Sequence, residues 1–289
     1  MKFLNSAGAS PAVFAALTHD DYNNEGADLS ITRLWAPFRQ TLLTRAHEVE
    51  VEATSRLRAL LGKAVHDYIH KVTVLNPQLN VLPERRLHAE VDGVKLSGQF
   101  DSLTLASGVL SDYKTTPVWS MLKGSKNDEW ALQLNSYAWL LRRQERPFEV
   151  ASLNVEVLML DWTPMEARRN PEYPRHTVMI VTLPLMPDDQ IDALIRARVA
   201  LWKDAQDNLP LCTSEETWER GGSFAVMKHG KARALKLCSS LDEATAWISS
   251  STKPAEKAYI EQRPAERIRC ETYCDVAQVC QQFQDWKAR

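Results

Sequence analysis

The stretch ERRLHAEVDGVKLSGQFDSLTLASGVLSDYKTT, residues 84–116, decides the fold that we predict for this chain. Two turn signals, Asp92-Gly93 and Ala106-Ser107-Gly108, interrupt a run of strand-forming residues. The pattern predicts a β-meander with one strand at about 95–105 and the next at about 109–115. The charged residues of the stretch can then be assigned to the faces of neighbouring strands.

Two acidic residues and one lysine fall where a single divalent metal site could use all three. Side chains alternate between the faces of a strand, so Asp112 and Lys114 point to one face and Tyr113 to the other. An adjacent antiparallel strand allows Asp101 to lie near Asp112. Two carboxylates can hold Mg²⁺ and leave positions for water and substrate, while a lysine can stabilise phosphate charge. This combination suits phosphodiester hydrolysis.

The elements around the meander predict an α/β fold with a mixed central sheet flanked by helices. We expect helices at about 49–71 and 130–143, strands at about 151–160 and 176–185, and a helix to about 207 that Asp188 or Asp189 caps. The first of these helices should bury one face through Leu57, Leu61 and Val65. Residues 1–207 would form the main domain with an N-terminal helical segment, and residues 208–289 a small C-terminal module.

The composition describes a globular chain of 289 residues with 44% hydrophobic residues and a formal net charge of −2. No apolar run approaches the length of a membrane span, and Asn5 and Ser6 interrupt the apolar start, so we expect neither a secretory signal nor membrane association. Binding to nucleic acid must therefore come from local basic clusters, although each could also be ordinary solvated surface. The candidate clusters are Lys123, Lys126, Arg142 and Arg143, then Lys228, Lys231, Arg233 and Lys236, then Arg263, Arg267 and Arg269.

Four motifs follow one another in a distinctive order. They are Gly62-Lys63-Ala64-Val65-His66 on a helix, Gly98-Gln99-Phe100-Asp101, Asp112-Tyr113-Lys114, and Gln133 with Tyr137 four residues later. In this order they resemble the RecB-like branch of the PD-(D/E)XK nuclease superfamily over about residues 30–145. A lone Asp-x-Lys occurs by chance, whereas the ordered set is much more specific. The resemblance implies a restriction-endonuclease-like core.

The resemblance also implies a role for each matching residue. The catalytic residues would be Asp101, Asp112 and Lys114. The ligands of an active-site Mg²⁺ or Mn²⁺ would be His66, Asp101, Asp112 and the backbone carbonyl of Tyr113. Lys114 would position or activate the attacking water and stabilise charge on the scissile phosphate, while Gln133 and Tyr137 would orient Lys114 and contact the DNA backbone.

Simpler explanations stay open for the same residues. Asp112 and Lys114 could be a surface ion pair on a strand, and Asp101 could cap a turn. The remaining simple explanations are an ordinary helix histidine for His66 and a polar helix face for Gln133 and Tyr137.

Two further polar residues lie beside the motifs. His70 follows His66 by one helical turn, and such a pair could suggest zinc. Relatives often carry an acidic residue at this position, so we expect a surface role for His70 or a role in supporting a ligand. Glu84 is expected at the edge of a strand, with a functional contact as the alternative.

Three of the five cysteines, Cys270, Cys274 and Cys280, lie within eleven residues. An odd number crowded at one end does not indicate a secreted disulfide scaffold and favours a reduced, cytoplasmic protein. Some RecB-like nucleases hold a [4Fe–4S] cluster through such a trio and one distant cysteine that precedes the core. Here no cysteine precedes the core, and Cys212 is the natural fourth ligand. Cys238 is the alternative, although its apolar strand favours burial. The resemblance implies a [4Fe–4S] cluster, with Zn²⁺ as the alternative.

We therefore expect an Mg²⁺- or Mn²⁺-dependent deoxyribonuclease that acts on single- or double-stranded DNA. By resemblance it would be an exonuclease in recombination, repair or phage DNA processing, in the host cytoplasm if phage-encoded, with a recombination or replication protein as a possible partner. One alternative is a non-catalytic DNA-binding protein with a metal-cysteine module. A second alternative is an RNA-directed or structure-specific endonuclease.

Overall fold

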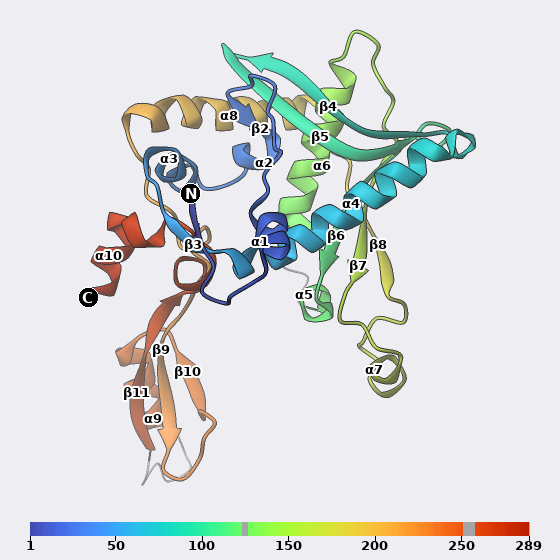
Figure 1. The fold of residues 1–289 in the computed structure, drawn as a ribbon. Coiled ribbons are helices and arrows are strands. Elements are labelled where there is room, and N and C mark those ends of the chain that lie inside the picture. The colour runs from blue at the N-terminus through green and yellow to red at the C-terminus, as the bar shows by residue number, and fades with distance from the viewer. Residues whose placement is uncertain (123–126, 251–257, 289) are drawn as a thin grey trace. The chain divides into compact units, whose positions relative to one another are not determined.

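The computed structural model describes residues 1–122, 127–250 and 258–288, which divide into two compact units (Figure 1). Unit 1 contains Met1–Leu42 and Glu50–Leu209, and unit 2 contains Leu43–Val49 and Pro210–Arg289. Within the described ranges no helix is long and apolar enough to cross a membrane. Lys123 and Lys126, two of the candidate DNA-binding residues, lie outside the described residues.

A six-stranded mixed sheet forms the centre of unit 1 and confirms the predicted fold class. The strands are β2 (Leu29–Ser30), β4 (Val81–Val91), β5 (Val94–Thr104), β6 (Val109–Thr116), β7 (Ser152–Met159) and β8 (Val178–Leu183). Their order is β2-β5-β6-β7-β8, with β4 also paired to β5. β6 and β7 are parallel, as are β2 and β5, and the other pairs are antiparallel. The meander predicted from residues 84–116 is therefore β4, β5 and β6.

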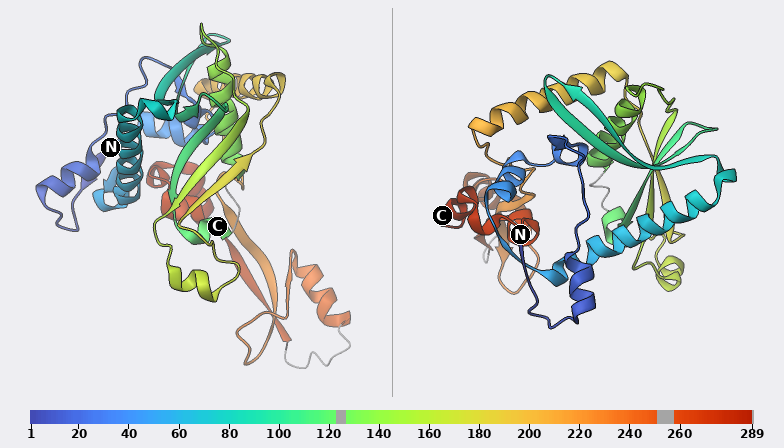
Figure 2. Two further views of the ribbon diagram at one scale, coloured as in Figure 1. Left: turned by 90° about the vertical axis from the view of Figure 1, so that its right-hand side faces the viewer. Right: turned by 45° about the horizontal axis from the view of Figure 1, so that its top comes forward.

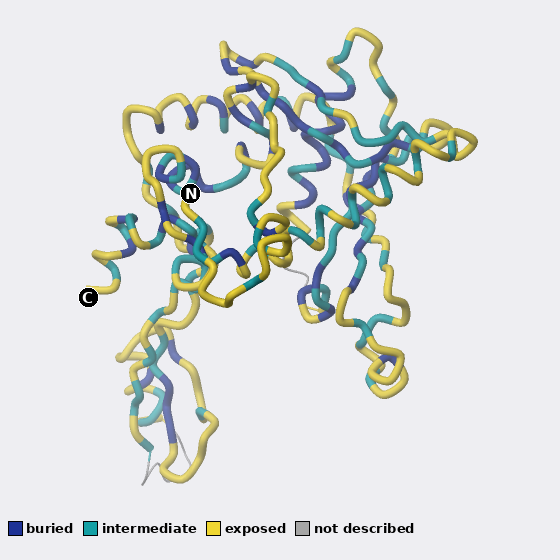
Figure 3. Tube along the Cα trace, viewed as in Figure 1, coloured by how far each residue is buried: buried dark blue, intermediate teal, exposed yellow. Residues whose placement is uncertain are grey.

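Helices cover both faces of this sheet (Figure 2). α6 (Asn127–Arg142) and α8 (Asp188–Asp207) lie on one side, and α4 (Leu57–Leu75) lies on the other. α6 is the most buried helix because its apolar residues face the sheet and α8; Leu134, Ala138, Leu140 and Leu141 are fully buried (Figure 3). Burying each leucine side chain stabilises the fold by about 1.5–3 kcal/mol. This packing fixes α6 above β5 and β6, the strands with the charged motifs.

Short helices complete unit 1. They are α1 (Pro11–Thr18), α2 (Ile31–Leu34), α3 (Phe38–Ala46, which continues into unit 2), α5 (Val118–Leu122) and α7 (Pro164–Arg169), with 3-10 turns at Ala53–Arg56 and Pro77–Leu79. The hydroxyl of Ser30 caps α2 by accepting from the amide of Arg33. α8 begins at Asp188 without a side-chain cap, because Pro187 occupies the capping position. The expected acidic cap of this helix was therefore wrong.

The helix predicted at about 49–71 was wrong at its start and in its burial. Residues Glu50–Glu52 form β3, which pairs in parallel with β1 (Lys2–Leu4), so the helix begins only at Leu57. None of its side chains is fully buried, and Leu57 and Leu61 are 51% and 42% exposed. The reason is that α4 packs on β4 and β6 by one face, and its other described contacts are with short elements, namely α1 and the 3-10 turns at Ala53–Arg56 and Pro77–Leu79.

Unit 2 contains a small three-stranded antiparallel sheet with β9 (Glu219–Lys228) between β10 (Lys236–Cys238) and β11 (Ala258–Arg267). α9 (Leu241–Ser250) packs on it around a core of Val226, Cys238 and Ala244. The chain then forms a π-helical turn (Arg269–Tyr273), a 3-10 turn (Ala277–Val279) and α10 (Gln281–Lys287). Cys238 is 2% exposed, as expected of a small buried hydrophobe.

Candidate active site

A hydrogen bond between Asp101 and Tyr113 links β5 and β6 just beyond the point where their regular pairing stops. The antiparallel register runs from Thr104↔Val109 to Ser102↔Ser111. One residue further, Oδ2 of Asp101 accepts a hydrogen bond of 2.6 Å from the backbone N–H of Tyr113. On the opposite side of the strand, the Tyr113 hydroxyl donates to Oγ of Ser102 at 2.8 Å. The carboxylate of Asp101 therefore replaces a strand partner and is held beside the Asp112-Tyr113-Lys114 motif.

Asp112 and Lys114 lie on one face of β6, as side-chain alternation predicts. The Lys114 ammonium is 2.5 Å from Oδ2 of Asp112, and the two side chains are 28% and 4% exposed. Burial raises the pKa of Asp112, and Lys114 opposes that shift. Burial would lower the pKa of Lys114, but the Asp112 charge outweighs it and raises this pKa, so Lys114 is an ammonium. Asp112 and Lys114 are therefore a buried ion pair, not the surface pair of the simpler explanation.

One oxygen of Asp112 has incomplete hydrogen bonding. The contact of Oδ2 with Lys114 is close but lacks the alignment of a hydrogen bond, and no other described residue donates to this buried atom. Buried polar atoms without an aligned partner are rare in folded proteins and often mark a site for a ligand or ion. Oδ2 of Asp112 is thus available to a further cation.

His66 reaches this cluster from α4. Its Nε2 lies 2.7 Å from the carbonyl oxygen of Tyr113, and its Nδ1 lies 3.2 Å from Oδ1 of Asp101. Burial would lower the pKa of His66, but the hydrogen bond and charge of Asp101 outweigh it and raise the pKa. α4 approaches β6 closely here, because a Cβ on Gly62 would lie only 3.3 Å from Oγ1 of Thr115. The absent side chain of Gly62 helps to bring His66 within reach of the strand.

Gln133 and Tyr137 lie on α6, one turn apart. The Gln133 amide donates to the Tyr137 hydroxyl at 2.7 Å. Tyr137 is 4% exposed, and burial, followed by the charge of Asp112, raises its pKa to about 12. Neither residue makes a direct hydrogen bond to Lys114 among the described interactions. The described interaction of Tyr137 with Lys114 and Asp112 is electrostatic, so the expected role of Gln133 and Tyr137 in orienting Lys114 stays a prediction.

Glu84 adds a third carboxylate, for which the sequence favoured a strand-edge position and left a functional contact as the alternative. It lies on β4, and burial, then the charge of Asp101, raise its pKa. His70 acts on the same carboxylate in the opposite direction and favours a lower pKa of Glu84. Nδ1 of His70 is buried without a described hydrogen-bond partner. Both residues therefore border the cluster of His66 and Asp101.

These side chains border a cavity of about 760 Å³ in unit 1. The residues of the motifs that line it are Gly62, Lys63, His66, Gly98, Gln99, Asp101, Tyr113, Lys114 and Tyr137. Asp112 does not line the cavity directly, because it is buried beneath Lys114. The motifs, which are spread over more than seventy residues of sequence, therefore meet at one opening.

Several cavity residues were not assigned a role from the sequence. Arg86 on β4 donates to Gln99 on β5, and its guanidinium lies 5.1 Å from the ring centre of Tyr22. Lys63 forms an ion pair with Asp21. The signal for Arg86 was its position two residues after Glu84 on the same face of a strand. The N-terminal segment with Asp21 and Tyr22 gave no signal, because its pattern is weak.

The donors suit a hard divalent cation. A histidine nitrogen, two carboxylates and a carbonyl oxygen lie together, and Oδ2 of Asp112 still lacks an aligned donor. Among the described side chains, however, no three His, Cys, Asp or Glu residues converge at the spacing of a formed metal site. His66 points to Asp101 and Tyr113, and Lys114 points to Asp112. The donor set fits a metal such as Mg²⁺, and the side chains would turn toward it from their mutual contacts.

The C-terminal cysteines lie in unit 2. Burial, followed by the nearby thiols of Cys274 and Cys280, raises the pKa of Cys270 to about 11. The side-chain amide of Gln282, the second residue after Cys280, binds the backbone of Cys212. Its oxygen accepts from the Cys212 N–H at 2.8 Å, and its nitrogen donates to the Cys212 carbonyl at 2.7 Å. No disulfide joins these cysteines, and no described trio has metal-ligand spacing. The predicted cluster ligands are neighbours, but the structure does not support a formed cluster.

A comparison with protein-family models agrees with the motifs. The model of the family described as the PD-(D/E)XK nuclease superfamily matches residues 19–281. A solved structure described as SSO0001 is 17% identical with a TM-score of 0.40, covering 65% of this chain and 82% of that chain. A phage related exonuclease from Haemophilus somnus 129PT is 13% identical with a TM-score of 0.34, covering 51% of this chain and 69% of that one. A comparison with curated proteins gave no match.

Proposed function

Because this chain belongs to the PD-(D/E)XK nuclease superfamily, we propose that it is a metal-dependent deoxyribonuclease of the RecB-like type. The proposal includes exonuclease action in DNA recombination, repair or phage DNA processing. The observation that carries it is that Asp101 and Lys114 line one cavity, with Asp112 paired to Lys114 beneath it and His66 against the carbonyl of Tyr113. The reaction would add water to phosphorus and break one P–O ester bond.

The proposed metal ligands are His66, Asp101, Asp112 and the carbonyl of Tyr113. An Mg²⁺ or Mn²⁺ held by them would polarise the phosphoryl oxygen and lower the pKa of a bound water. Asp101 contributes in a second way, because its hydrogen bond to the Tyr113 amide fixes the backbone whose carbonyl is a proposed ligand. The position of the Tyr113 carbonyl, a proposed ligand, therefore depends on the hydrogen bond that follows the last paired residues of β5 and β6.

Lys114 is proposed to act as a cation. Its raised pKa keeps the ammonium protonated at neutral pH, so it can donate hydrogen bonds to phosphate oxygens and to the attacking water. Its flexible stem is 28% exposed at the cavity, whereas its partner Asp112 is buried. In this arrangement Lys114 stabilises developing negative charge without acting as the base.

A cleavage assay tests the proposed activity. Labelled linear and circular DNA, single- and double-stranded, would be incubated with the full chain in Mg²⁺ or Mn²⁺. We expect cleavage by the wild type and by Asp207→Asn, an exposed control at the end of α8, and a loss of at least about 10²-fold with Asp112→Asn. Equal activity of Asp112→Asn and wild type would remove the catalytic assignment.

The same assay separates the alternatives. DNA binding without cleavage by the wild type, in either metal, would favour a non-catalytic DNA-binding protein. Preferential cleavage of RNA or of branched DNA would favour an RNA-directed or structure-specific endonuclease. Release of mononucleotides from linear DNA, with circles left intact, would support the exonuclease proposal.

We also propose that Cys212, Cys270, Cys274 and Cys280 hold a structural [4Fe–4S] cluster, with Zn²⁺ as the alternative. The support is the crowding of three thiols and the attachment of Cys212 next to them by Gln282. Anaerobically purified protein should show visible absorbance that bleaches on reduction, and Cys270→Ser should lose it while Cys238→Ser keeps it. A colourless protein with one equivalent of zinc would support the alternative, and a protein without iron or zinc would refute both.

A further inference from the structure

The candidate basic clusters differ in whether acidic side chains already neutralise them. Arg142 and Arg143 both contact Asp188, at 2.8 and 3.1 Å. Arg267 pairs with Glu219 at 2.8 Å. Charges committed to such pairs must be separated before they can bind an anionic partner. These arginines are therefore explained by the packing of their own unit.

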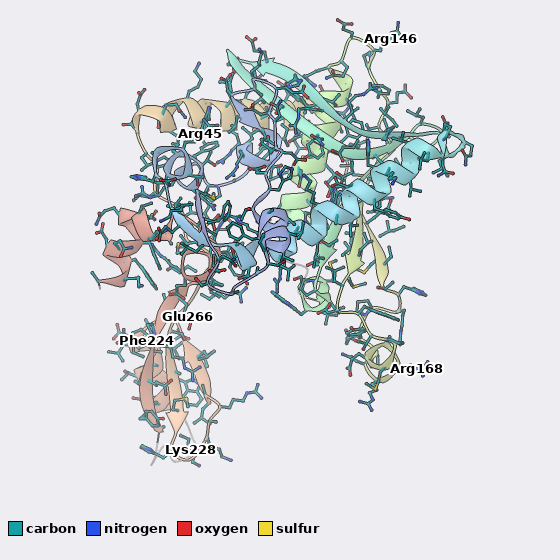
Figure 4. All side chains as sticks on the ribbon, in the orientation of Figure 1. Arg45, Arg146, Arg168, Phe224, Lys228 and Glu266 are labelled. Carbon is teal, nitrogen blue, oxygen red and sulfur yellow. The ribbon has the colours of Figure 1, made fainter. Side chains whose placement is uncertain are left out.

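The remaining cluster, which we call the basic turn, consists of Lys228, Lys231, Arg233 and Lys236. It surrounds the connection between β9 and β10 in unit 2. Gly230 has a φ of +78° there, and the Lys231 amide donates to the carbonyl of Lys228 at 3.0 Å, so the chain reverses tightly. The strands then hold the four cations at one end of the sheet; Figure 4 shows Lys228 at this end and Glu266 toward the other.

The basic turn is exposed and has no acidic neighbour in sequence. Residues 220–241 contain five basic residues and no acidic residue, although the whole chain carries a net charge of −2. All four side chains of the basic turn are exposed, and none forms an ion pair with a residue that the structure describes. Hydrogen bonds from Ser239 lower the pKa of the Glu243 carboxylate, and the charge of Lys236 contributes to this lowering without forming an ion pair. A concentrated positive charge is thus left facing solvent.

We propose that the basic turn binds the phosphate backbone of DNA, as a substrate-docking surface separate in sequence from the catalytic motifs. The inference rests on the proposed deoxyribonuclease function. The connection between β9 and β10 lies at one end of the three-stranded sheet, so its exposed side chains can approach a DNA backbone, and four lysine or arginine side chains on one turn match the repeating charge of that backbone. Because phosphate contacts read no bases, the surface would add affinity without sequence preference.

The experiment compares two variants that lose the same charge. The first is Lys228→Ala, Lys231→Ala, Arg233→Ala and Lys236→Ala in the full chain. The control is Lys95→Ala, Arg146→Ala, Arg168→Ala and Arg169→Ala, four exposed basic residues of unit 1. Both are made together with Asp112→Asn to prevent cleavage, and binding to labelled single- and double-stranded DNA is measured between about 50 and 200 mM salt.

We expect the first variant to bind DNA at least about tenfold more weakly. The slope of log K against log salt concentration should become shallower by about 3–4, because four phosphate contacts are lost. The control should stay close to the parent protein. Equal binding by the parent and the first variant, or equal weakening of both variants, would overturn the proposal. Binding to vesicles of anionic lipid in preference to DNA, lost in the first variant, would also overturn it.

Two further measurements keep the result interpretable. The Tm of the first variant should be unchanged, since the substituted side chains are exposed. If this variant unfolds at a lower temperature, two double variants replace it, Lys228→Ala with Lys231→Ala and Arg233→Ala with Lys236→Ala.

Cleavage is measured separately with Asp112 intact. DNA cleavage by the wild type with unaltered DNA binding by the first variant would refute the basic turn alone. Absence of cleavage with weakened DNA binding would refute the nuclease proposal alone.

Discussion

Lys114 shows how one residue can combine a structural and a chemical requirement. Its ammonium offsets the charge of a carboxylate that is 4% exposed, and it also reaches the cavity. Removing it leaves Asp112 without the contact that favours its charged form. The residue is therefore expected to matter both for phosphate chemistry and for the protonation of its neighbour.

We predict that Lys114→Met lowers the rate of DNA cleavage by about 10²–10³-fold, because a preorganised donor to developing phosphate charge is lost. Steady-state kinetics on labelled duplex should place the effect in kcat. Lys95→Met, on the exposed side of β5, serves as the control and should retain full activity. A loss confined to KM would contradict the proposed role of Lys114.

Gly98 is a second residue whose identity the structure explains. A Cβ at this position would lie 2.6 Å from Cδ1 of Leu140 and 2.9 Å from Cε1 of Tyr137. We predict that Gly98→Ala lowers the free energy of unfolding by about 1–3 kcal/mol, through overpacking between β5 and α6. Gly62→Ala should cost less, since its nearest contact is 3.3 Å and alanine favours helix. Urea unfolding of both variants measures the difference.

Residues of the site differ in how far the sequence could place them. Alternation along β6 and the two turn signals were enough to bring Asp101 next to the Asp112-Tyr113-Lys114 motif, because both depend on local sequence. The contact of His66 with the Tyr113 carbonyl depends on the docking of α4 over Gly62, which no local pattern encodes. The functional roles of these residues stay predictions.

At the scale of elements, α6 and α8 are joined by polar contacts at the edge of a buried interface. The indole N–H of Trp139 donates to Oδ1 of Asp192 at 2.9 Å, and Arg143 and Arg196 reach the same carboxylate. Burial alone would raise the pKa of Asp192, but these hydrogen bonds outweigh it and lower the pKa. The carboxylate is therefore bound more strongly in its ionised form.

This lowered pKa predicts an acid-sensitive contribution to stability. A group whose pKa is lower in the folded state stabilises the fold above its unfolded pKa, about 3.9 for aspartate, and this contribution is lost as the pH falls through the folded pKa. We predict that Asp192→Asn lowers the free energy of unfolding by about 1.5–3 kcal/mol at pH 7, and by much less near pH 2. Asp207→Asn, an exposed control, should leave the free energy of unfolding close to that of the wild type at pH 7. Urea unfolding at the two pH values measures both variants.

Elements were predictable where their pattern is local and continuous. The meander and α6 follow from alternation, turn residues and helical periodicity, and the structure confirms them. The start of α4 was predicted too early, because Glu50–Glu52 forms a strand that pairs with Lys2–Leu4, nearly fifty residues away in sequence. The apolar stripe of α4 looked like a buried face, since sequence periodicity reports amphipathicity but not the number of covering layers.

At the scale of the whole molecule, metal binding should act on stability as well as on cleavage. A ligand that binds only the folded state stabilises it by about 2.7 kcal/mol at one hundred times its Kd. We predict that Mg²⁺ or Mn²⁺ raises the Tm of the wild type, that chelation reverses the shift and abolishes cleavage, and that readdition restores both. Asp101→Asn with His66→Ala should lose the shift, and Asp207→Asn should keep it. A shift of equal size in both would show that the metal binds elsewhere.

The units of this protein are not consecutive along the chain, because Leu43–Val49 groups with Pro210–Arg289. Leu43 and Val49 are 7% and 1% exposed, so their environment is complete only when the later segment is present. During translation at about 5–20 residues per second, this short segment would wait roughly ten seconds or more for its partners. A fragment ending at Leu209 would keep two apolar side chains without their cover, and one starting at Pro210 would lack part of its own unit. Dividing the protein for expression therefore requires keeping Leu43–Val49 with the C-terminal unit.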